Sequence, residues 1–231
     1  MDVATRCNNI SLYSTPNNWN YSMQEIIPGL FLGPYSVASK DCRNLLLDQG
    51  ITHIVCVRQP GEDDFIRPYI TDPIFTYLTL EIADTATENI IRFFPKVRQF
   101  IDNAWAKNAK VLIHGNNGNS RSATLVLAYI MEKLGLTCKD AYTLVKKRRE
   151  CIKPNEGFFA QLAEYEPIYK ARQILEQGES STDKHRYKRK SEHLTEMVDI
   201  DLIQPPSSPV SNGEDMCVQD LEIYYNQLHL M

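Results

Sequence analysis

A buried strand that runs through a glycine-bearing loop into an apolar helix is the feature of this sequence that most restricts its fold. Residues 110–114 read Lys-Val-Leu-Ile-His, an apolar run typical of a strand buried on both faces. A polar turn follows at 115–120, and the apolar stretch 123–131 predicts a helix that ends near Gly135. Such a strand belongs in a mostly parallel sheet that helices cover on both faces.

Strands and helices alternate on either side of this unit. The sequence predicts further strands at 27–33, 51–57 and 75–80, and helices at 39–49, 90–105, 140–150 and 158–175. This alternation predicts an α/β domain with a central, mostly parallel sheet flanked by helices, over residues 22–176.

The two ends of the chain differ from this domain in composition. Residues 1–21 are rich in Asn, Ser and Thr and predict a flexible N-terminal arm. Residues 177–231 contain a basic run at 184–190 and the sequence Pro-Pro-Ser-Ser-Pro at 205–209, which predict a disordered tail. The basic run is either a solvated charge cluster or a nuclear-import signal.

Composition excludes several classes of function. The net charge of −4 gives no reason to expect nucleic acid or an anionic membrane as the partner. No apolar run is long enough to span a bilayer, and the N-terminus does not resemble a secretory signal. The six cysteines are scattered, without zinc spacing, so we expect no metal, no cofactor and a reducing compartment.

The loop between the central strand and its helix has the composition of an anion site. Six residues that curl before a helix point successive backbone N–H groups inward, and the helix N-terminus adds further donors. Arg121 adds a planar fork that suits two phosphate oxygens, although its alternative role is a structural salt bridge. The predicted phosphate-binding residues are Gly115, Asn116, Asn117, Gly118, Asn119, Ser120 and Arg121.

The same stretch resembles the signature of the dual-specificity protein tyrosine phosphatases, His-Cys-x-x-Gly-x-Ser-Arg-Ser. Five positions match, namely His114, Gly118, Ser120, Arg121 and Ser122. Gly115 stands where that family has its nucleophilic cysteine. The resemblance implies that His114 and Ser122 support the loop and take no part in chemistry.

Further segments extend the resemblance to about 150 residues of the chain. Pro28–Gly33 is similar to the family's opening strand, and the segment 148–158 is similar to its late helix–turn–helix. Asp84 falls where the family carries its general acid. Two interpretations of Asp84 remain open, a relic of that acid or an ordinary surface residue.

The glycine decides which activity the resemblance implies. In this family a thiolate attacks phosphorus, and glycine has no side chain that could do so. The nest consists of backbone N–H groups, and glycine accepts nearly any backbone conformation, so binding survives the replacement. The sequence therefore predicts no catalytic residue and a pseudophosphatase that binds phosphorylated Ser, Thr or Tyr side chains without dephosphorylating them.

Partners follow from the resemblance alone. Some inactive members of the family have the same loop sequence, His-Gly-Asn-x-Gly-x-Ser-Arg-Ser, and they imply phosphorylated MAP kinases as partners. We further expect a monomer that is present in cytoplasm and nucleus. Two alternatives stay open: a phosphate-independent scaffold, for example for an F-box ubiquitin ligase subunit, and a weak dual-specificity phosphatase.

Overall fold

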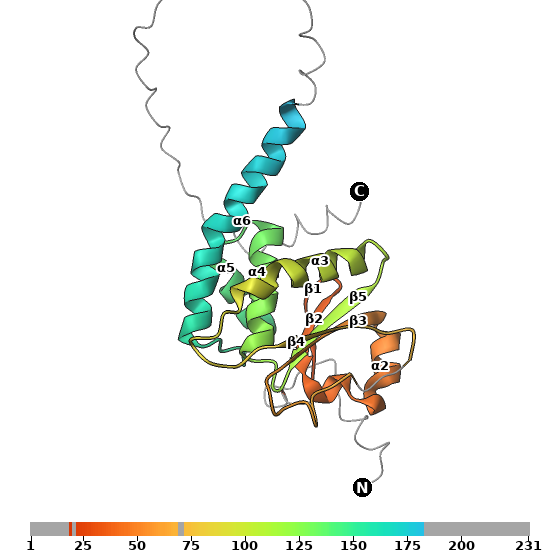
Figure 1. Cartoon of the computed structure of the whole chain (residues 1–231). Helices are drawn as coiled ribbons and strands as arrows, with labels where there is room; N and C mark the ends of the chain where they lie inside the picture. Colours follow the sequence, from red (N-terminus) through yellow and green to blue (C-terminus); the bar gives the residue numbers. More distant parts are fainter. Residues whose placement is uncertain (1–18, 20–21, 69–71, 183–231) are drawn as a thin grey trace, which may run out of the picture. The chain divides into compact units, whose positions relative to one another are not determined.

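The computed structural model describes residue 19 and residues 22–68 and 72–182, with side chains described up to residue 175. Its core is a five-stranded sheet in the order β1-β2-β5-β3-β4 (Figure 1). The β1–β2 pair is antiparallel, and the other three pairs are parallel. The strands are β1 (Gln24–Ile27), β2 (Leu30–Pro34), β3 (Ile51–Arg58), β4 (Thr76–Glu81) and β5 (Lys110–Gly115).

The central strand β5 lies between β2 and β3 and is buried along almost its whole length. Leu112 of β5 is in register with Phe31 on one side and Ile54 on the other. Because β2, β5 and β3 are parallel, their carboxyl ends meet at one edge of the sheet. The loop that follows Gly115 therefore begins at this edge, and the predicted α/β sheet is confirmed.

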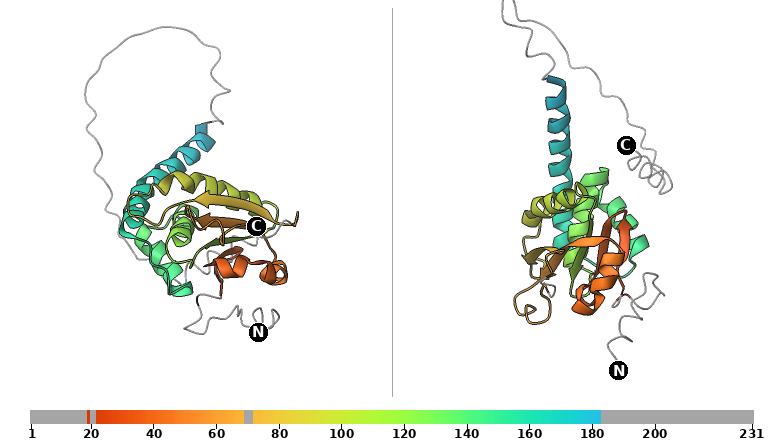
Figure 2. Two further views of the ribbon diagram at one scale, coloured as in Figure 1. Left: turned by 60° about the horizontal axis from the view of Figure 1, so that its bottom comes forward. Right: turned by 90° about the vertical axis from the view of Figure 1, so that its right-hand side faces the viewer.

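Helices cover both faces of the sheet. On one face Leu46 of α2 packs in a cluster with Phe31, Ile54 and Leu112. The helices α3 and α4 contact the other face, and the left view of Figure 2 shows α2 (orange) and α3 (yellow-green) on opposite sides of the strands. The helices are α2 (Arg43–Asp48), α3 (Phe94–Trp105), α4 (Arg121–Leu134), α5 (Cys138–Arg148) and α6 (Glu156–Thr182), with short 3-10 turns at Tyr35–Ala38, Lys40–Cys42 and Ile91–Phe93.

Three elements differ from the sequence prediction. The opening strand is a hairpin, because Gly29 has a φ of +80° and its N–H donates to Glu25 Oε1, which turns the chain between β1 and β2. The helix predicted at 39–49 begins as a 3-10 turn and becomes α-helical at Arg43. The last helix continues to Thr182 instead of ending near Leu175, and Pro167 lies inside it.

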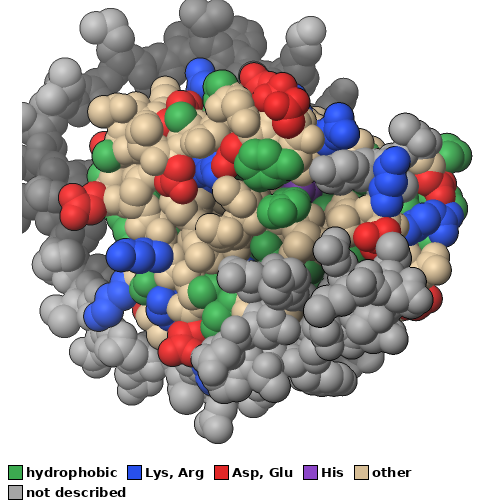
Figure 3. All heavy atoms as spheres, turned by 90° about the horizontal axis from the view of Figure 1, so that it is seen from below, with side chains coloured by type: hydrophobic (Ala, Val, Ile, Leu, Met, Phe, Trp, Pro, Cys, Tyr) green, Lys and Arg blue, Asp and Glu red, His purple; other side chains and the backbone are tan. Residues whose placement is uncertain are grey.

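Most of the predicted arm and most of the predicted tail, including the basic run, lie outside the described residues. Within the described part, no helix combines the length and apolarity that crossing a membrane requires. Acidic and basic side chains are interspersed on the face seen in Figure 3, which agrees with the small net charge.

Candidate phosphate-binding site

The loop between β5 and α4 forms the floor of a pocket of 240 Å³. All of the predicted phosphate-binding residues line it, and Asp84 and Ser122 line it as well. Gln59 and Glu62, from the segment after β3, complete the lining, and sequence analysis had assigned them no role. His114 is not part of the lining, because it belongs to the buried strand below.

The carbonyls of residues 116–120 all accept hydrogen bonds from groups outside the loop. Their donors are the amides of Tyr35 (to Asn116 O, 3.2 Å), Lys153 (to Asn119 O, 2.7 Å) and Thr124 (to Ser120 O, 2.8 Å), and the Arg149 guanidinium (to Asn117 O, 2.7 Å, and Gly118 O, 3.0 Å). The amide N–H groups of residues 116–120 donate to no other group within the described residues. A loop with its carbonyls engaged and its amides available is the arrangement of an anion-binding nest.

Arg149 holds this loop in shape. Its side chain is fully buried and also donates to Ser22 O (3.1 Å), Gln24 Oε1 (2.5 Å) and Trp19 O (3.2 Å). Burial lowers the pKa of the guanidinium, but five hydrogen bonds to oxygen atoms compensate the buried charge. In the sequence, Arg149 is marked only as part of the segment that resembles the family, because an arginine that is buried under a distant loop has no local signature.

The two loop glycines differ in what the structure requires of them. Gly118 has a φ of +69°, and a Cβ there would lie 2.4 Å from Gly33 O, so no other residue fits without a shift. A Cβ on Gly115 would meet Ser122 Oγ at 3.2 Å and Val57 O at 3.5 Å, which is tight but possible. The backbone therefore needs glycine at position 118 and does not need it at position 115.

The Ser122 hydroxyl lies beside Gly115. The residue is 1% exposed, and its Oγ has no hydrogen-bond partner within the described residues. A buried hydroxyl normally has a partner, and one without it carries a desolvation cost. This hydroxyl lies next to where a Cβ on residue 115 would project, and its supporting role stays a prediction.

Arg121 forms a buried ion pair with Glu62. Its Nη1 is 2.7 Å from Oε2 and its Nη2 is 3.0 Å from Oε1, and each side chain is 7% exposed. Burial alone would raise the pKa of the Glu62 carboxyl, but hydrogen bonds from Arg121, the backbone N–H of Gln59 and the Asn116 side chain lower this pKa overall. The alternative role considered for Arg121, a structural salt bridge, is thus present in the structure.

Two donors of the Arg121 guanidinium make no hydrogen bond within the described residues, although Asp84 Oδ2 lies 3.7 Å from one of them, Nε. Nη1 also donates to Ile82 O at 3.3 Å, so both of its hydrogens are used, and Nη2 uses one of its two. The remaining donors, Nε–H and the second Nη2–H, are parallel and form one edge of the fork. Such an edge matches two oxygens of one phosphate group.

Asp84 lies at the rim of the pocket. Its Oδ1 accepts hydrogen bonds from Ser120 Oγ (2.7 Å) and Asn155 Nδ2 (2.9 Å), and its Oδ2 is 3.7 Å from Arg121 Nε. Ser120 of the loop and Asn155, just before α6, therefore hold this carboxylate at the rim. Both interpretations of Asp84, a relic of the general acid and an ordinary surface residue, stay open.

His114 lies beneath the loop and is 2% exposed. Burial lowers its pKa from 6.5 to about 4, whereas a hydrogen bond with the Gly115 backbone has a smaller, opposite effect. The imidazole is therefore neutral at pH 7, and its Nδ1 has no partner within the described residues. The structure thus places a neutral, enclosed ring beneath the loop, and its supporting role stays a prediction.

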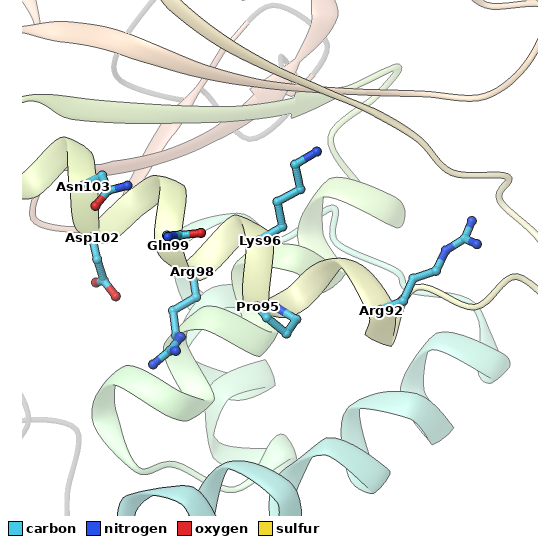
Figure 4. Close-up of a pocket in the computed structure, with 7 residues that line it drawn as sticks. All are labelled: Arg92, Pro95, Lys96, Arg98, Gln99, Asp102 and Asn103. Carbon is cyan, nitrogen blue, oxygen red and sulfur yellow. The ribbon is translucent and has the colours of Figure 1, made fainter. Parts of the chain in front are cut away.

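A second hollow, of 580 Å³, lies over α3 and the turn before it (Figure 4). Its lining residues are Arg92, Pro95, Lys96, Arg98, Gln99, Asp102 and Asn103. Figure 4 shows the long side chains pointing in different directions, and Arg98 and Asp102 already pair with Glu132 (3.3 Å) and Lys133 (3.4 Å) of α4. It therefore lacks the converging donors that the loop provides.

Comparison with known proteins places this geometry in a family. Residues 30–168 match the family described as "Dual specificity phosphatase, catalytic domain". The chain is 54% identical to serine/threonine/tyrosine-interacting protein A of Xenopus laevis, over 67% of this chain and 71% of that protein. It is 39% identical to human dual specificity protein phosphatase 9, over 62% of this chain and 35% of that protein.

A solved structure gives the same answer. The crystal structure of the human tyrosine phosphatase-like serine/threonine/tyrosine-interacting protein superposes with a TM-score of 0.62 at 56% identity. The match covers 64% of this chain and 97% of that one. The family match extends from β2 into α6 and includes the whole pocket. By sequence and by fold, this chain belongs to the dual specificity phosphatase family.

Proposed function

We propose that this chain is a pseudophosphatase that binds phosphorylated side chains without hydrolysing them. The observation that carries the proposal is the loop at 115–120, in which the carbonyls of residues 116–120 are held outward and the amides are available to an anion. The position of the loop before α4 adds the positive end of a helix dipole.

The side chains of the pocket explain why binding would not lead to turnover. Covalent transfer needs a nucleophile at the base of the loop, where this chain has Gly115. Ser120 lies at the other end of the loop from position 115, and Ser122 Oγ has no hydrogen-bond partner within the described residues that could activate it. We therefore expect no activated nucleophile at the position that the family's cysteine would occupy.

A relative supports the expected class of ligand. A mouse putative dual specificity phosphatase, 27% identical with a TM-score of 0.59, was crystallised "complexed with zinc tungstate". Tungstate is a tetrahedral oxyanion with the geometry of phosphate. The nest and the remaining edge of Arg121 would bind a ligand of this shape in this chain.

The proposed partners are phosphorylated proteins, with phosphorylated MAP kinases as the first to test, in cytoplasm and nucleus. An interaction of this kind would anchor a kinase or shield its phosphate from active phosphatases. The competing proposal, a phosphate-independent scaffold for a partner such as an F-box protein, would not use the pocket.

Calorimetric titration with a phosphorylated activation-loop peptide and its unphosphorylated twin tests the proposal. Arg121→Lys is the informative variant, because it keeps a positive charge beside Glu62 but removes the planar fork. Arg92→Lys makes the same exchange at an exposed arginine outside the pocket and serves as the control.

We expect binding that needs the phosphate, falls at least tenfold in Arg121→Lys and stays unchanged in Arg92→Lys. Equal binding of both peptides would favour the scaffold. Release of inorganic phosphate from the peptide by the unaltered protein would instead support a weak phosphatase.

A further inference from the structure

The charges in the pocket do not favour a dianion. Of the residues that line it, one is positive, Arg121, and two are negative, Glu62 and Asp84. The formal charge of the lining is therefore −1, although a phosphomonoester at pH 7 carries −1.5 to −2. Attraction to the loop amides and to Arg121 must overcome this repulsion.

Glu62 is the more closely engaged of the two carboxylates. Its side chain is 7% exposed, and both of its oxygens contact the two terminal nitrogens of Arg121. Asn116 Nδ2 donates to Oε1 at 3.2 Å, and the backbone N–H of Gln59 donates to Oε2 at 2.9 Å. The carboxylate therefore also uses donors on two sides of the pocket. A planar carboxylate on a guanidinium fork imitates the contact that two phosphate oxygens would make.

We infer that Glu62 is an internal competitor for phosphate, which occupies the end of the Arg121 fork and keeps the affinity of the pocket for dianions low. The inference rests on the proposed function, since it concerns the same ligand in the same pocket. A phosphate group would bind the remaining Nε–Nη2 edge while facing the Glu62 charge, or it would displace Glu62 from the fork. In either case the carboxylate opposes binding.

The opposite role is also testable. If Glu62 only orients Arg121, as a bidentate partner can, its removal would weaken phosphate binding. If it competes, its removal would strengthen binding. The two roles therefore predict changes of opposite sign in the same measurement.

The test measures the dissociation constants of a phosphotyrosine peptide and of the matching sulfotyrosine peptide. The two ligands share a tetrahedral shape, but the sulfate ester carries a single negative charge. Glu62→Gln removes the carboxylate charge and keeps the side-chain length, and Glu62→Ala provides a second variant if the amide disturbs the hydrogen bonds. Asp63→Asn removes the same charge from the neighbouring exposed residue and is the matched control.

We expect Glu62→Gln to bind the phosphopeptide at least tenfold more tightly, with a smaller gain for the sulfopeptide, and Asp63→Asn to change either constant less than twofold. A smaller gain for the lower charge distinguishes electrostatic competition from a structural effect. In the unaltered protein, the dissociation constants for the two peptides should lie within threefold of each other. A preference for the phosphopeptide of more than tenfold would contradict the inference.

The outcomes separate this inference from the proposed function. If the unaltered protein binds phosphopeptide through Arg121 but both Glu62 variants bind no more tightly, the competitor role is refuted and the phosphate site stands. If neither the unaltered protein nor the Glu62 variants bind either peptide, the proposed function and this inference fall together.

Discussion

Acid should destabilise this protein through His114, well above the pH at which carboxylates become protonated. The ring is enclosed under the loop, and its pKa falls from 6.5 to about 4 on folding. Between these two values the unfolded chain binds a proton at this ring and the folded chain does not. Stability that is present above pH 6.5 is therefore lost as the pH falls toward 4.

The size of the effect follows from the shift. A difference of about 2.5 pKa units corresponds to about 3 kcal/mol of unfolding free energy, of which about 2 kcal/mol is lost between pH 7 and pH 5. His53 contributes in the same direction, because burial and Lys107 lower its pKa too. The variant must therefore isolate His114 from the second histidine.

Urea unfolding of the unaltered protein and of His114→Gln, at pH 7 and at pH 5, provides the assay. His53 is present in both proteins, so the difference between their two pH dependences belongs to His114. We expect the unaltered protein to lose about 2 kcal/mol more than the variant over this interval. Equal losses, or an NMR titration of the His114 ring with a midpoint near 6.5, would refute the enclosed neutral imidazole.

Three substitutions test the loop itself. Arg149→Met should lower the unfolding free energy by at least about 3 kcal/mol in urea titrations, because buried loop carbonyls lose their donor; a loss below about 1 kcal/mol would contradict its role. Gly118→Ala should lower the unfolding free energy by about 3 kcal/mol. Gly61 also has a positive φ (+91°), but an added Cβ there would meet no described atom within 4 Å, so Gly61→Ala should lower it by only about 1 kcal/mol in the same assay. Gly115→Cys should gain measurable hydrolysis of a small aryl phosphate, since a Cβ fits there; a folded but inactive variant would show that the loop differs from that of an active enzyme.

Local sequence was enough to locate the site. The apolar run at 110–114, the turn after it and the apolar helix from 123 predict a strand–loop–helix unit on physical grounds alone, because each segment is read from its own residues. Gly115 and Arg121 could then be placed at the two ends of the loop by counting. The hairpin at Gly29 and the 3-10 start of the helix before Arg43 were missed, since short irregular elements give little periodicity.

The neighbours of the loop could not be predicted in this way. Arg149 reaches the loop carbonyls from 31 and 32 residues along the chain, and Glu62 reaches Arg121 across 59. Such pairs depend on how strands and loops pack, which no window of sequence contains.

The sequence by itself predicted the kind of site: a loop with the composition of an anion site at the end of a buried strand, with Gly115 where the resemblance places a cysteine. The tertiary structure alone decided its charge. Glu62, Asp63 and Asp64 are three consecutive acids with the same local pattern, yet only the first is buried. Hydrogen bonds with Gln59, Asn116 and Arg121 turn that carboxylate inward. Glu62 belongs to the pocket because of where its side chain lies, and not because it is an acid. The effect of its charge on a ligand depends on their separation and on the dielectric constant between them.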